Sequence, residues 1–196
     1  MTVLLIAGSP SAKSRSAALL DGVQQRLKQR GALATRLHIR ELSAQALILA
    51  DFGHPSILQA TQQVADADVL VVSTPVYKAA YSGLLKVFLD LLSQTALEGK
   101  TVLPLATGGS PHHMLALDYA LRPVLQSLGA KHILPGIYAT DAQITLSPEG
   151  VYQITQEIGS RLDAAVNTLI TETMRPVLAP AGEFKAVDFS QVRCSV

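Results

Sequence analysis

The sequence contains little cysteine and little charge, and each shortage excludes a class of protein. Cys194 is the only cysteine, so one chain can build neither a disulfide framework nor a multi-cysteine metal site. Charged residues make up 16% of the chain, and 16 basic against 15 acidic residues leave a net charge of +1 without a block of like charge. This balance gives nucleic acid or anionic lipid nothing to bind, so a ligand has to be recognised locally.

Long hydrophobic runs are also missing. The first apolar run, Val3–Ala7, has no basic residue before it and is too short for the core of a signal peptide. The longest uncharged stretch in the middle of the chain, Thr101–Leu117, contains Pro104 and Pro111, which a bilayer span would not tolerate. We therefore expect a cytoplasmic protein with no membrane and no nucleic-acid partner.

Hydrophobic residues, by contrast, make up 48% of the 196 residues, enough for one well-filled core. We expect one domain over residues 1–175, followed by a loosely structured tail over residues 176–196 that contains Pro and Gly. The tail is not expected to contribute to chemistry.

Short apolar runs alternate with longer segments of helical period, which predicts an α/β fold. Strands that are apolar on both faces are typical of a parallel sheet covered by helices on each side, a doubly wound architecture. The five predicted strands are Val3–Ala7, Leu33–Ile39, Val69–Ser73, Val102–Ala106 and Ile133–Tyr138.

Capping and stop signals predict the helices between these strands. The segment 40–52 is apolar but irregular, which favours a subunit contact. The predicted helices run from Ser14 to Gly31, from Pro55 to Ala65, over Leu84–Leu92 behind a Ser82 cap, and from Pro148 to Thr173.

Another helix is predicted from the stripe formed by Met114, Leu117, Leu121, Val124 and Leu128. Tyr119 lies off this stripe. Pro123 has no N–H for the carbonyl of Tyr119, so we expect a kink or a π-bulge here, a feature that often occurs at functional sites.

Ligands of open α/β sheets bind beyond the carboxyl ends of the strands, and the loop after the first strand suits a phosphate. Ser9, Ser14, Arg15 and Ser16 supply hydroxyls and a cation beside a helix N-terminus. An ordinary turn with redundant serine capping is the alternative. No Gly-x-Gly-x-x-Gly occurs, and neither a complete P-loop nor a Gly-x-Ser-x-Gly elbow is present.

The loops after the third and fourth strands offer flat apolar surface and accessible backbone amides, which suit an aromatic ring system. The third-strand loop contributes Pro75, Val76, Tyr77, Lys78, Tyr81 and Gly83 as candidates, and the fourth-strand loop contributes Thr107, Gly108, Gly109 and Ser110. Tyr77 and Tyr81 are alternatively a cover for the helix end. His112 and His113 lack a second ligand cluster, so no metal is expected.

Three runs carry a family resemblance: Ala7-Gly8-Ser9-Pro10 with Ser14-Arg15-Ser16, the run 74–83, and Leu105-Ala106-Thr107-Gly108-Gly109. Over residues 1 to about 175 the chain resembles the NADPH-dependent FMN reductase family. The runs 75–83 and 118–121 are most similar to the FMN reductases of alkanesulfonate-utilisation systems.

The resemblance implies a flavodoxin-like fold of strand order 2-1-3-4-5, with the FMN phosphate on the first loop and the isoalloxazine between the third and fourth loops. It also implies that NADPH, or NADH, reduces FMN and that reduced flavin passes to a partner monooxygenase. In the subgroup, a tyrosine matching Tyr119 creates a π-bulge near the flavin at a subunit interface. The apolar helix over Leu84–Leu92 and the position of Tyr119 off the stripe of its own helix predict a homodimer or homotetramer. Tyr119 is alternatively an interface residue without influence on flavin transfer.

Three other functions remain open on the sequence. A quinone or azo-dye reductase would keep FMN tightly bound, whereas a flavodoxin-like electron carrier would react poorly with nicotinamide nucleotides. A non-enzymatic flavin-binding module would bind without turnover. The NADPH preference rests on the resemblance, because no 2′-phosphate site is apparent among the basic residues.

Overall fold

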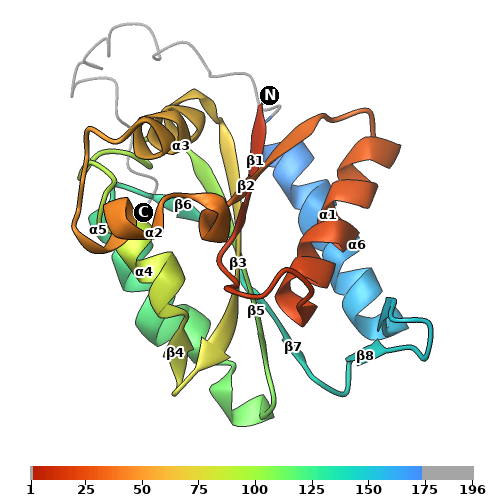
Figure 1. Ribbon diagram of the computed structural model, residues 1–196. Helices are drawn as coiled ribbons and strands as arrows, with labels where there is room; N and C mark the ends of the chain where they lie inside the picture. The colour runs from red at the N-terminus through yellow and green to blue at the C-terminus, as the bar shows by residue number, and fades with distance from the viewer. Residues whose placement is uncertain (1, 174–196) are drawn as a thin grey trace, which may run out of the picture.

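A parallel sheet forms the centre of the molecule in the computed structural model, which describes residues 2–173 (Figure 1). Its order is β2-β1-β3-β5-β6, with β7 also paired to β5. The strands span β1 Val3–Ala7, β2 Ala34–His38, β3 Val69–Tyr77, β5 Thr101–Gly108, β6 His132–Ile133 and β7 Ile137–Thr140. The predicted doubly wound fold and the order of its strands are confirmed.

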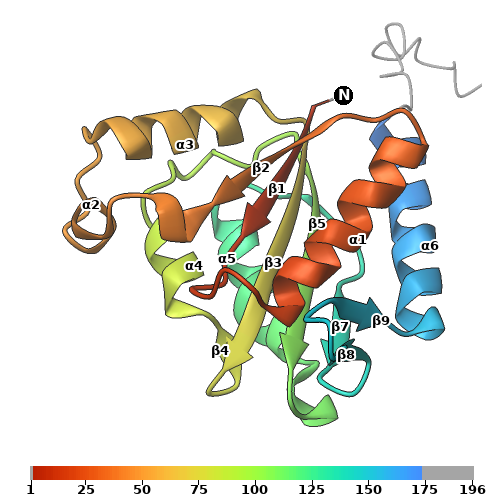
Figure 2. The ribbon, with the colours of Figure 1, turned by 45° about the vertical axis from the view of Figure 1, so that its right-hand side comes forward.

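Helices cover both faces of this sheet (Figures 1 and 2). One face packs against α1 Arg15–Gln29 and α6 Gln156–Thr173. The other packs against α3 Pro55–Asp66, α4 Gly83–Leu89 and α5 Arg122–Ser127, with the short α2 Ala44–Ile48 at its margin. Each face has a separate apolar core, so neighbouring residues along β1 and β3 contribute to opposite cores.

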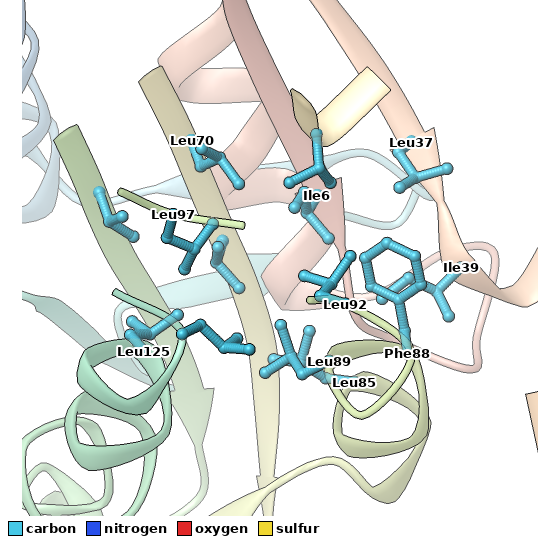
Figure 3. Packing of buried hydrophobic residues seen from close by; sticks show 14 of the residues in the cluster. Ile6, Leu37, Ile39, Leu70, Leu85, Phe88, Leu89, Leu92, Leu97 and Leu125 are labelled. Carbon is cyan, nitrogen blue, oxygen red and sulfur yellow. The ribbon is translucent and has the colours of Figure 1, made fainter. Parts of the chain in front are cut away.

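The core on the α4 side consists of buried apolar side chains. Phe88 and Leu85 of α4 and Leu125 of α5 are fully buried. Figure 3 shows these side chains among those of Ile6 and Leu70 from the sheet. Phe88→Ala at such a site would typically cost about 3–5 kcal/mol, so this core holds α4 firmly beneath the loop that precedes it.

The predicted fifth strand, Ile133–Tyr138, is divided into β6 and β7. β6 ends opposite Val102 and β7 begins opposite Leu105. The three residues 134–136 between β6 and β7 therefore lie opposite only two residues of β5, Leu103 and Pro104. Pro104 and Pro135 lie in this interval and have no N–H to donate, so the ladder is interrupted there.

The predicted cap of the first helix is confirmed. Ser14 Oγ accepts the N–H of Ala17 at 3.1 Å, and the helix stops before Gly31, whose φ is +74°. The predicted helix behind Ser82 is shorter than expected and ends at Leu89, because the chain turns at Asp90, although Leu91 remains buried.

The helix around Tyr119 contains the expected bulge. Residues Leu117–Leu121 form a π-helix, and α5 continues from it to Ser127. The predicted apolar stripe is confirmed for Leu117, Leu121 and Leu128, which are buried, and for Val124, which is partly buried against the same core. It is wrong at Met114, which is exposed, and it omitted Leu125, which is fully buried. The buried positions 117, 121, 125 and 128 keep spacings of three and four, so the misplaced position is confined to the turn before the π-helix.

The predicted start of the last helix is also wrong. Instead of beginning at Pro148, the helix begins at Gln156, after a hairpin of β8 Ile144–Leu146 and β9 Tyr152–Ile154. Gly150 allows the turn of this hairpin with its φ of +76°. The expected tail, residues 176–196, and Cys194 lie outside the described residues. No helix within residues 2–173 is long and apolar enough to cross a membrane.

Candidate functional site

Three loops meet at one edge of the sheet, where β1, β3 and β5 end (lower end in Figure 2). The strands are parallel, so their carboxyl ends, and the loops that follow them, lie at the same edge. This brings the three sequence-predicted loops to one place.

The first loop begins with a close backbone approach. The N–H of Gly8 donates to the carbonyl of Ser73 at 2.8 Å. A Cβ on Gly8 would lie 3.0 Å from that carbonyl oxygen and 3.1 Å from Leu85 Cβ. Only glycine fits between β3 and α4 without displacing either element.

The serines of this loop are arranged around the start of α1. The hydroxyls of Ser14 and Ser16 are 3.1 Å apart, and Ser9 is buried with its Oγ accepting the N–H of Ser11 at 3.2 Å. The first-turn amides of α1 point out of the same helix end, where the helix dipole favours an anion. The loop therefore has the donors that a phosphate dianion requires.

Arg15 is held by a neighbouring loop that sequence reasoning missed. Its Nε donates to the carbonyl of Ile144 at 2.9 Å and lies 3.5 Å from Asp141 Oδ1. Within residues 2–173, no hydrogen bond engages its two terminal nitrogens, and 37% of the side chain is exposed. The guanidinium is thus oriented by its inner nitrogen while its outer end remains available to an anion.

The segment after Ser73 is a strand and a tight hairpin rather than the expected loop. β3 continues to Tyr77 and pairs antiparallel with β4, Ala80–Tyr81. The two turn residues, Lys78 and Ala79, have φ of +49° and +64°. A two-residue hairpin turn requires left-handed residues, and two non-glycine residues there store strain of about 1–2 kcal/mol each. Backbone strain of this kind is concentrated at functional sites.

Buried hydroxyls join this hairpin to the first loop. Ser82 Oγ donates to the carbonyl of Gly8 and accepts the N–H of Leu85, which caps α4. The N–H of Ser82 donates to Thr74 Oγ1 at 2.9 Å, and Ser73 Oγ donates to the carbonyl of Ser16 at 2.8 Å. These hydrogen bonds therefore connect the first loop directly to the hairpin and to α4.

The loop after β5 approaches both the hairpin and β7. An added Cβ on Gly108 would lie 3.4 Å from Val76 Cβ, so these two segments are adjacent. Ser110 Oγ accepts the N–H of His112 at 3.3 Å and caps a 3₁₀ turn over Pro111–His113. The hydroxyl of Tyr138 donates to the carbonyl of Ser110 at 2.6 Å, a partner that sequence reasoning missed.

The other predicted residues have varied surroundings. Pro75 and Thr107 are buried and face each other across β3 and β5. Tyr77 is exposed, whereas Tyr81 is half-buried, and burial raises the pKa of its phenol. Gly83 is the first residue of α4 and has open space where a Cβ would be. Gly109 has only Asp141 Oδ2 near that position, at 3.8 Å.

Tyr119 is 79% exposed on the π-helix, which contacts β4 of the hairpin. Met114 and Leu115 are exposed on the preceding turn. His112 is exposed, and the described part of the chain has no group of three His, Cys, Asp or Glu residues that could hold a metal ion.

A separate groove of about 890 Å³ lies between α1, α6 and the β8–β9 hairpin. It includes Lys13 and Ser14 from the first loop but no residue of the β3 hairpin or the β5 loop. We place the candidate site at the three loops because the carboxyl ends of β1, β3 and β5 meet there, where ligands of parallel sheets bind.

Comparisons with known proteins identify relatives over most of the chain. The family described as NADPH-dependent FMN reductase matches residues 1–145. An FMN reductase (NADPH) of Pseudomonas putida KT2440 is 46% identical over 182 residues, covering 90% of this chain and 92% of the relative. An FMN reductase (NADPH) of Escherichia coli K12 is 45% identical, covering 86% and 87%. The NADH-dependent FMN reductase SfnE of Pseudomonas putida is 35% identical, covering 74% and 79%.

Solved structures agree with this assignment. An apo NADH:FMN oxidoreductase (EMOB) superposes with a TM-score of 0.78 at 38% identity, covering 87% of this chain and 89% of that one. A flavodoxin from Streptococcus pneumoniae matches with a TM-score of 0.59 at 12% identity, covering 87% and 97%, which supports the fold alone. The chain belongs to the NADPH-dependent FMN reductase family.

Proposed function

We propose that this protein transfers hydride from NADPH to FMN and releases reduced FMN to a partner monooxygenase. Family membership supports the reductase activity and the use of FMN and NADPH. The observation that carries the proposal is the buried bond from Ser82 to Gly8, which joins a phosphate-type loop to a hairpin with an exposed aromatic face. A flavin mononucleotide has these two parts, a phosphate and a flat ring, joined by a short chain.

The residues at the three loops fit FMN. The start of α1, with Ser14, Ser16 and the outer end of Arg15, would hold the phosphate. The backbone around Val76–Lys78 and Gly108–Ser110 would lie along the ring, beside Tyr77. Ser9, Pro75, Tyr81, Gly83 and Thr107 complete the proposed site as residues that shape the three loops.

Hydride transfer between the two rings requires no chemical step at a side chain of the protein. Bound FMN supplies the atom that accepts hydride, and the protein aligns the nicotinamide and flavin rings. Backbone N–H groups from the β3 hairpin and the β5 loop would stabilise the negative charge that develops on the ring. No side chain has to act as an acid or base, so the proposed site residues bind and orient.

The proposal makes FMN a substrate, and a titration of FMN tests it. NADPH oxidation is followed at low enzyme concentration, with dissolved oxygen as the terminal acceptor and FMN added from zero. We expect a rate near zero without FMN that rises to saturation as FMN is added. The matched control replaces FMN with a quinone in the absence of flavin and should give no turnover.

Two other outcomes of the titration contradict the proposal. Full activity with a quinone and no added FMN, from a yellow protein, would indicate a reductase that retains its flavin. FMN binding with slow NADPH oxidation would indicate an electron carrier or a flavin-binding module.

The release of reduced FMN to a monooxygenase is the finer part of the proposal. Support comes from the runs shared with the FMN reductases of alkanesulfonate systems, Pro75–Gly83 and Asp118–Leu121. We also propose a homodimer or homotetramer, since Met114, Leu115 and Tyr119 form exposed apolar surface beside the site.

We propose that Tyr119 assists flavin release. Tyr119→Ala should slow the dissociation of FMN severalfold and lower coupled turnover, measured by stopped-flow fluorescence and by product formation with a flavin-dependent monooxygenase. Within one subunit the substitution should leave the packing of the core unchanged, because the side chain is 79% exposed in the single chain. Unchanged dissociation and unchanged coupled turnover would leave Tyr119 with a packing role only.

A further inference from the structure

Tyr138 connects β7 to the loop after β5. Its backbone pairs with Ala106 of β5, and its side chain belongs to the same buried core as Leu117 and Leu121 of the π-helix. From this core the hydroxyl reaches the carbonyl of Ser110 at 2.6 Å, across 28 positions of the sequence. Packing in the core thus fixes the position of the Tyr138 ring, and the hydroxyl hydrogen-bonds the loop after β5.

The same hydroxyl also lies against Gly108. A Cβ added at Gly108 would be 2.5 Å from Tyr138 Oη and 3.4 Å from its Cζ. Tyr138 therefore contacts the loop on both sides of Gly109, through the Cα of Gly108 and the carbonyl of Ser110. Removing the hydroxyl would leave that carbonyl without its donor and open space under Gly108.

The phenol is suited to remain a donor. Burial raises the pKa of Tyr138, and the negative charge of Asp141 raises it further. The hydroxyl therefore keeps its proton throughout the neutral and mildly alkaline range, so the Ser110 carbonyl always faces a donor.

We propose that Tyr138 is a positioning residue that fixes the Gly108–Ser110 turn against the flavin ring and thereby sets the affinity of the ring. The inference rests on the proposed function, because it assumes that this turn lies along FMN. It assigns a role in ring binding to a residue that does not itself need to touch the flavin.

Riboflavin separates ring binding from phosphate binding because it lacks the phosphate. Tyr138→Phe should raise the dissociation constants of FMN and riboflavin by the same factor, about threefold to tenfold, and shift the visible absorption band of bound flavin. Arg15→Ala serves as the comparison, since it should weaken FMN and leave riboflavin unchanged. Tyr152→Phe, outside the site and without a described hydroxyl partner, should alter neither.

A second pair of variants tests the contact with Gly108. Gly108→Ala should weaken riboflavin binding because its Cβ meets Tyr138 Oη, and adding Tyr138→Phe to that variant should weaken binding by a smaller factor than it does in the unsubstituted protein. Losses that simply multiply in the double variant would overturn the contact on which the inference depends.

The remaining outcomes are distinct. Unchanged dissociation constants in Tyr138→Phe, or a loss confined to FMN, would overturn the positioning role while leaving the proposed function intact. Failure of the unsubstituted protein to bind either flavin would refute the proposed function, and with it the site that Tyr138 is inferred to shape.

Discussion

Replacing Ser82 by alanine is expected to lower the free energy of unfolding by about 2–4 kcal/mol. The substitution removes the cap of α4, where Ser82 Oγ accepts the N–H of Leu85 at 3.1 Å. It also leaves the buried carbonyl of Gly8 without its donor. Thermal unfolding should show a fall in Tm of about 5–15 °C for a chain of this size.

Ser43→Ala provides the matched control. Ser43 caps α2 through the N–H of Ala46 at 3.3 Å, and within residues 2–173 its Oγ makes no second hydrogen bond. Its replacement should cost about 1 kcal/mol, the value of a cap alone. Equal losses in the two variants would mean that the bond to Gly8 contributes nothing. The Ser82 variant should additionally bind FMN more weakly, because the first loop loses its tie to the β3 hairpin.

Arg15→Ala is expected to weaken FMN binding by about 1.5–3 kcal/mol, the usual contribution of a charge-assisted hydrogen bond. The loss should be confined to FMN, because riboflavin has no phosphate for the guanidinium to contact. Isothermal titration with both flavins measures the difference directly. Arg15→Lys should recover part of the affinity, because a lysine restores the charge but not the planar fork that Ile144 orients.

A charge control distinguishes this contact from a general loss of positive potential. Lys131 is exposed and directly precedes β6, so it lies at the opposite edge of the parallel sheet from the three loops. Lys131→Ala should leave FMN affinity unchanged, since interactions of exposed charges are screened beyond a Debye length of about 10 Å. Equal affinities of the Arg15 variant and the unsubstituted protein would remove Arg15 from the phosphate site.

Local signals in the sequence predicted much of the fold. Ser14 and Ser82 cap the expected helices. Pro123 indicated the π-bulge, because the lack of an N–H on proline affects the carbonyl four residues earlier whatever the rest of the fold is. The β8–β9 hairpin was missed because its strands are three residues each, too short for a periodic pattern.

The candidate site was predictable only in part. The serines and glycines of the loops are visible in the sequence, but their partners come from distant segments. Tyr138 lies 28 residues beyond Ser110, and Ile144 lies 129 residues beyond Arg15. The pairing of β7 with β5 brings Tyr138 to Ser110, and the packing of β8 against α1 brings Ile144 to Arg15; both depend on the whole fold rather than on any local run.

The break between β6 and β7 affects how copies of this protein can associate. An unbroken edge strand offers a row of free backbone groups on which a neighbouring molecule can add a strand, the route to uncontrolled aggregation. Here Pro135 interrupts that row, and Arg122 occupies the carbonyls of Ile133 and Leu134 with its terminal nitrogens. This edge is therefore protected against strand addition, so pairing of strands between two copies would have to use β2 at the opposite edge of the sheet.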